Sequence, residues 1–299
     1  MQEFLLVSPL PNWRGNEQKI TDEIGIRQLR PKERQALQYS ATLLEHHDVD
    51  EAAKDSWWLC YEFDNPHPAD NIRHRRRLEA AFKLAMHAQY AVQILAPAGA
   101  PNVYLLYRRT GEGLELETTQ KRLAFIPSVW GRVAAVPAEF GEQVPALLDG
   151  MREVFQKPIL RLQIPVWLLE QGLAAPDRHI RILLWATGLD GLTRSGGIAR
   201  FSERLCELLG PAAHIFPPAE GYRRPVHTVG DVTEDLYQLR TEMAHGLPFH
   251  EKFRKTRGLL AEGGEPVCDE FAGWRYDQVL EECAVFLLCN ALRETVLRG

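Results

Sequence analysis

Asp231-Val-Thr-Glu-Asp-Leu-Tyr-Gln-Leu-Arg-Thr-Glu-Met-Ala-His-Gly-Leu-Pro248 predicts one helix with both ends marked. Asp231 or Thr233 can cap its start, because a short polar side chain there accepts a hydrogen bond from a free backbone N–H. Gly246 followed by Pro248 is a typical stop signal. At about 100° per residue, four apolar side chains share one face that we expect in a core: Val232, Leu236, Leu239 and Met243.

Beside this apolar face runs a second stripe that is too polar for a core: Tyr237, Arg240, Thr241, Ala244 and His245. The long side chain of Arg240 can converge with the imidazole of His245 on a ligand that lies along the stripe. A guanidinium that holds phosphoryl oxygens beside an imidazole that moves a proton suits phosphate chemistry. Arg and His on one helix also make surface or inter-helix contacts, so a structural role stays open.

The segment Arg240-Thr-Glu-Met-Ala-His245 resembles the Arg-x4-His motif of HEPN domains (higher eukaryotes and prokaryotes nucleotide-binding). Residues 181–193 and 198–210 look like the paired helices that precede the motif helix in Apea-like HEPN proteins. The resemblance covers about residues 155–297. It implies a helical bundle and a metal-independent endoribonuclease that acts as a homodimer. Thr241 stands where active members often carry Asn, Asp or His.

Under this resemblance Arg240 and His245 are the expected catalytic residues. The imidazole acts as acid and base, and the guanidinium steadies the phosphate. RNA supplies its own nucleophile, the 2′-hydroxyl, so neither a metal nor another cofactor is expected. Tyr237 and Thr241 are expected to orient these groups or contact the sugar. Further candidates for substrate binding lie before and after the helix: Arg223, Arg224, His250, Lys252, Arg254 and Lys255.

Composition limits the partners of this chain. Its 299 residues carry a net charge of −5, so any contact with RNA must rely on local patches. The five cysteines include no Cys-x2-Cys pair, which indicates neither a zinc site nor a disulfide framework and favours a reducing cytoplasm. No apolar stretch reaches about 18 residues, so we expect no transmembrane helix and no membrane partner.

Residues 1–150 predict a mixed α+β domain with a sensing or regulatory role. Strands are expected at 3–9, 24–29, 56–63, 103–108 and 114–117, and the last two are expected to form a hairpin. Helices are expected at 31–45 and 72–95, and residues 137–149 lead into a short helix. The densest basic run of the chain, Arg73-His-Arg-Arg-Arg77, opens the second of these helices. It is either a solvated face or a strip that contacts a phosphate backbone.

Residues 151–299 predict an all-α bundle, because the strand patterns fade and helical periodicity continues to the end. Helices are expected at 158–172, 176–192, 198–209, 231–245 and 274–297, which makes the chain mainly α overall. Cys283 and Cys289 lie in the apolar pattern of the last helix and are expected to be buried thiols.

Two functions remain for this chain. The first is an endoribonuclease acting in stress response or antiviral defence, which the Arg240/His245 pair and the basic run after it favour. The second is a non-catalytic HEPN-like module that binds a nucleotide, RNA or a protein while residues 1–150 sense a signal. The net charge of −5 and Thr241 favour this alternative.

Overall fold

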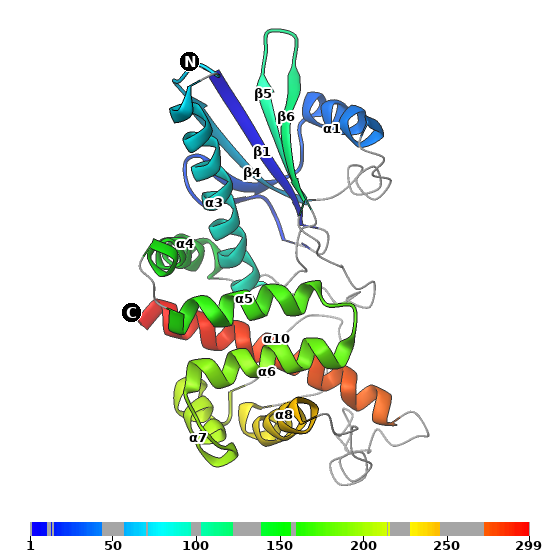
Figure 1. The fold of residues 1–299 in the computed structure, drawn as a ribbon, viewed down its shortest axis with the longest axis vertical. Coiled ribbons are helices and arrows are strands. Elements are labelled where there is room, and N and C mark those ends of the chain that lie inside the picture. Colours follow the sequence, from blue (N-terminus) through cyan, green and yellow to red (C-terminus); the bar gives the residue numbers. More distant parts are fainter. Residues whose placement is uncertain are drawn as a thin grey trace. The chain divides into compact units, whose positions relative to one another are not determined.

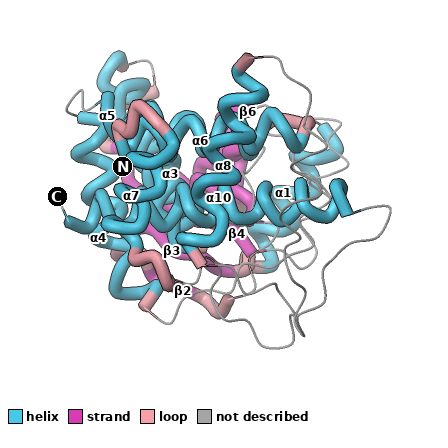
Figure 2. The backbone as a smooth tube through the Cα atoms, turned by 90° about the horizontal axis from the view of Figure 1, so that it is seen from below, coloured by secondary structure: helices cyan, strands magenta, loops and turns pink. Residues whose placement is uncertain are grey.

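The computed structural model describes residues 2–10, 13, 15–43, 57–69, 71–96, 103–121, 139–156, 160–213, 215, 228–245 and 272–298. The chain folds into two compact units, Met1–Arg152 and Glu153–Gly299. Figure 1 shows the elements along the chain, and Figure 2 separates the strands (magenta) from the helices (cyan). The structure confirms a mainly helical chain with an N-terminal antiparallel sheet.

The first unit is built on a six-stranded sheet in the order β2-β3-β4-β1-β5-β6. The strands span Gln2–Leu10 (β1), Gln18–Lys19 (β2), Ile24–Arg27 (β3), Trp57–Asn65 (β4), Val103–Arg109 (β5) and Leu114–Lys121 (β6). Every neighbouring pair is antiparallel. The predicted hairpin is confirmed, since β5 and β6 pair directly on either side of residues 110–113. β2 was not predicted, because two residues carry no readable alternation.

Helices cover both faces of this sheet. Along the central strand β1 seven consecutive residues are buried, so the strand lacks the alternating pattern of a half-exposed sheet. Alternate residues such as Leu5 and Val7 pack in a cluster with Leu37 of α1, Pro31–Leu43. On the other face Phe4 meets His74, which belongs to α3, Ile72–Leu95. α1 and α3 therefore lie on opposite sides of the sheet (Figure 1).

The helix α4, Phe140–Gln156, is longer than the short helix that the sequence predicts. The division between the two units, after Arg152, falls inside this helix and not in a linker. Pro145 lies in the second turn of α4, where its ring removes one hydrogen bond of the helix.

The second unit consists of helices in its described part. They span Leu160–Ala174 (α5), Arg178–Thr193 (α6), Ile198–Leu209 (α7), Val229–Ala244 (α8) and Ala272–Arg298 (α10). α6 packs against α5, α8 and α10, and α7 packs against α8. Gly172 allows α5 to approach Trp185 of α6, because a Cβ atom there would lie only 2.2 Å from the indole nitrogen. Cys283 and Cys289 of α10 are buried free thiols, as predicted.

Candidate functional site

The helix that carries the predicted Arg and His begins earlier than the sequence suggests. Thr228 is its N-cap, so the assignment of the cap to Asp231 or Thr233 was wrong. Asp231 instead occupies the third helical position and completes a capping box: its carboxylate accepts hydrogen bonds from the backbone N–H of Thr228 at 2.9 Å and from the Thr228 hydroxyl at 2.7 Å. Thr233 is buried in the helix.

The two faces of α8 differ in burial as expected. Val232, Leu236 and Leu239 are fully buried, whereas Met243 is only half-buried. Along the polar stripe, Tyr237, Arg240 and Thr241 are half-buried, and Ala244 and His245 are exposed. The polar stripe therefore lies at the boundary between the bundle and solvent.

Arg240 is held by two neighbours. Its Nη2 donates to Oδ2 of Asp190 on α6 at 2.6 Å, and its guanidinium carbon lies 5.3 Å from the centre of the Tyr237 ring. That ring in turn contacts Phe201 of α7, with 5.1 Å between centroids. The guanidinium is thus fixed in place at a partly exposed site, with 24% of the Arg240 side chain and 18% of the Asp190 side chain open to solvent.

Asp190 is the functional candidate that sequence reasoning missed. Its second oxygen, Oδ1, accepts a hydrogen bond from the buried Ser195 hydroxyl, so both carboxylate oxygens have a partner. Ser195 lies in the short connection at residues 194–197 between α6 and α7. A signal was present: Asp190 is the one acidic residue in α6, and it sits in an otherwise apolar stretch between Gly188 and Gly191.

Thr241 and His245 are the remaining site residues that the sequence predicts on α8. The Thr241 hydroxyl donates to the Tyr237 carbonyl at 2.9 Å, which is a bond within the helix. His245 is the C-cap and lies just after the last helical turn, whereas the sequence had predicted it inside that turn. Its backbone N–H donates to the carbonyls of Thr241 at 3.1 Å and Glu242 at 3.2 Å. The backbone of His245 is therefore held at the end of the helix, and its side chain is exposed.

The loop residues predicted to bind substrate lie outside the described part of the chain: Arg223, Arg224, His250, Lys252, Arg254 and Lys255. Among the described residues, no group of three or more His, Cys, Asp or Glu side chains is arranged to hold a metal ion. In the same residues no helix is both long and apolar enough to cross a membrane.

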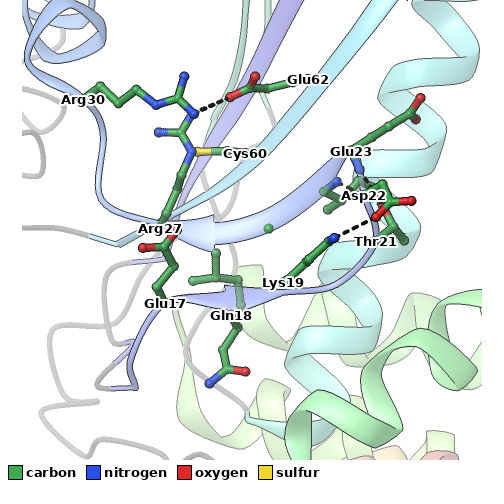
Figure 3. A pocket seen from close by; sticks show the side chains of 13 residues that line it. Glu17, Gln18, Lys19, Thr21, Asp22, Glu23, Arg27, Arg30, Cys60 and Glu62 are labelled. Carbon is green, nitrogen blue, oxygen red and sulfur yellow. Dashed lines mark hydrogen bonds and ion pairs between the residues drawn. The ribbon is translucent and has the colours of Figure 1, made fainter.

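A pocket of about 460 Å³ in the first unit is the second candidate site. Figure 3 shows it beside β2 and β3 and marks the ion pair between Lys19 and Asp22. The charged residues that line it are Glu17, Lys19, Asp22, Glu23, Arg27, Arg30 and Glu62. Acidic and basic groups are mixed along this wall, so the pocket does not present one sign of charge to a ligand.

The most buried cation of this pocket already has partners. The two Nη atoms of Arg27 donate to Glu33 at 2.7 and 3.0 Å, and Nη2 also donates to Glu62 at 2.9 Å. Burial by itself would lower the pKa of Arg27, but these carboxylates raise it above its usual value. Burial raises the pKa of the neighbouring Cys60 thiol to about 12, so no thiolate forms at neutral pH. Arg27 therefore stabilises the sheet and α1, and Cys60 is an inert thiol.

Comparison with known proteins assigns neither a family nor a function to this chain. No family model matches the sequence, and no match was found among curated proteins or solved structures.

Proposed function

We propose that this chain is a metal-independent endoribonuclease of the HEPN type, with Arg240 and His245 as its catalytic residues. The observation that carries the proposal is the guanidinium of Arg240, which two neighbours orient at a partly exposed site of α8, the helix whose C-cap is the exposed His245. A guanidinium already oriented by Asp190 and Tyr237 loses little entropy when it binds a phosphate.

The reaction uses only groups that the chain and its RNA substrate supply. The 2′-oxygen of RNA attacks the adjacent phosphorus while His245 accepts the 2′-proton. The bond from phosphorus to the 5′-oxygen breaks, and the leaving oxygen takes a proton from an imidazolium of a second copy in a homodimer. Arg240 stabilises the negative charge on the non-bridging oxygens. The products are a 2′,3′-cyclic phosphate and a 5′-hydroxyl.

The test is a cleavage assay with purified protein and labelled structured RNA in excess chelator. We expect His245→Ala to lower the rate by roughly 10²–10⁴-fold and Arg240→Ala by roughly 10²–10³-fold. Arg298→Ala is the matched control, because Arg298 is also an ion-paired helical arginine of the second unit, bound to Glu294 at 3.1 Å. Equal cleavage by the wild type and both site variants would remove Arg240 and His245 from the mechanism.

The second candidate function is a non-catalytic module that binds RNA, a nucleotide or a protein. The ion pair between Arg240 and Asp190 favours it, because the charge of the arginine already has a carboxylate partner. RNA that stays intact with the wild-type protein but binds to it would support the module.

A further inference from the structure

The first turns of α3 carry a cluster of positive charge. Residues 71–83 contain five cations and one acid, Glu79, within a chain whose net charge is −5. Arg73, Arg75, Arg76 and Lys83 are exposed, and we call these four residues the α3 basic strip. At about 100° per residue, Arg76 and Lys83 point away from the buried side of α3, and Arg73 and Arg75 flank them.

Two members of the strip, Arg73 and Arg75, lie in the first turn of α3, where the helix dipole disfavours positive charge. The N-terminal end of a helix carries a partial positive charge, so acids are favoured there and cations are not. The first turn of α3 contains no acid, and its N-cap is the neutral Asn71, whose side chain accepts from the N–H of Arg73 at 2.8 Å. The helix dipole therefore does not account for the charges of Arg73 and Arg75.

The other two members of the basic run have structural roles. His74 is buried, and its ring lies 3.0 Å from the Asn65 amide nitrogen. Arg77 lies over the Phe63 ring and donates to the Asp64 carbonyl at 3.3 Å. In the described residues no side chain of the strip has an ion-pair partner, so its charges are available to an external anion.

We propose that the α3 basic strip binds the phosphate backbone of RNA. Three of its four cations are arginines, whose planar fork matches phosphate oxygens with two parallel hydrogen bonds. The charges follow one exposed helix face over about three turns, which fits an extended polyanion better than a single small anion. The choice of RNA over other polyanions rests on the proposed ribonuclease function.

The experiment measures binding apart from cleavage. A fluorescent single-stranded RNA is titrated with the full chain carrying His245→Ala, and anisotropy is read at several salt concentrations. The test variant adds Arg75→Gln and Arg76→Gln. The matched control adds Lys32→Gln and Arg34→Gln, which removes two exposed cations from the start of α1 in the same unit.

We expect the test variant to bind RNA roughly tenfold or more weakly, with the slope of log affinity against log salt reduced by about 1.4, or 0.7 for each lost phosphate contact. The control should keep the wild-type slope. The thermal midpoint of the test variant should be no lower than that of the wild type, since the removed charges oppose the helix dipole.

Two results of the RNA titration would overturn the inference: an unchanged salt slope in the test variant, or an equal loss of RNA affinity in the control. In a parallel titration with anionic vesicles, a test variant that loses vesicle binding and keeps RNA binding would also overturn it. The last would assign the strip to a membrane surface. If the wild-type protein does not cleave RNA in excess chelator, the proposed ribonuclease function is wrong. The anisotropy titration still tests RNA binding by the strip separately.

Discussion

Two ion pairs at opposite ends of α6 differ in their exposure to solvent and in the number of partners that hold the arginine. Arg181, near the start of the helix, pairs with Glu281 of α10, and each side chain is at most 4% exposed. The guanidinium of Arg181 also donates to the carbonyls of Ala175 at 2.8 Å and Pro176 at 3.0 Å. Asp190, near the end of the helix, pairs with Arg240 at a rim that remains partly open to solvent.

The difference determines which of the two arginines can reach a ligand. A buried guanidinium with several fixed partners cannot bind a ligand without leaving a buried carboxylate unpaired, which is costly. A rim arginine held at one nitrogen by a carboxylate is oriented but still reachable. The first arrangement predicts large effects on stability. The second predicts small effects on stability and, under the proposed function, large effects on activity.

The largest expected effect on stability comes from the buried pair. Glu281→Gln should lower the free energy of unfolding by about 3–5 kcal/mol, because the guanidinium groups of Arg181 and Arg178 lose their shared carboxylate. Chemical denaturation followed by circular dichroism measures this loss. Replacing Arg181 and Glu281 together by methionine should restore most of it, and a loss below about 1 kcal/mol in the single variant would contradict the structural role.

A second buried carboxylate extends the comparison to the first unit. Burial would raise the pKa of Glu33, but hydrogen bonds from Arg27 and Arg30 hold it below its usual value. Its contribution to stability should be present at neutral pH and be lost as the pH falls through the folded-state pKa. Urea denaturation of the wild type and Glu33→Gln from pH 7 to pH 3 should show the two stabilities converging on acidification. A constant difference would exclude this linkage.

The smallest expected effect on stability comes from the rim pair. Asp190→Asn should cost about 1 kcal/mol or less, because the pair is partly exposed and asparagine keeps an acceptor for Ser195. If the proposed function holds, the same change should slow RNA cleavage by roughly 10–100-fold, because the guanidinium loses its orientation. Denaturation and cleavage assays on one preparation measure both. A large stability loss with unchanged cleavage would make the pair structural.

The sequence by itself determined the elements with strong periodicity. It predicted α3 over 72–95, the β5–β6 hairpin and the buried face of α8, because burial of one face imposes a period of 3.6 or 2 on the apolar residues. It also singled out Arg240 and His245 by residue type and spacing. It could not find the start of α8 at Thr228, because capping depends on which of several short polar residues the chain turns at.

Only the tertiary structure decided what each charged residue meets. Asp190 and Arg240 lie fifty positions apart in the sequence and join only when α6 packs against α8. The same holds within the basic run of α3, where folding buries His74, stacks Arg77 on Phe63 and leaves Arg73, Arg75 and Arg76 exposed. Residue type fixes the charge of a side chain, but its solvation and its partners depend on contacts between distant segments, which local patterns do not encode.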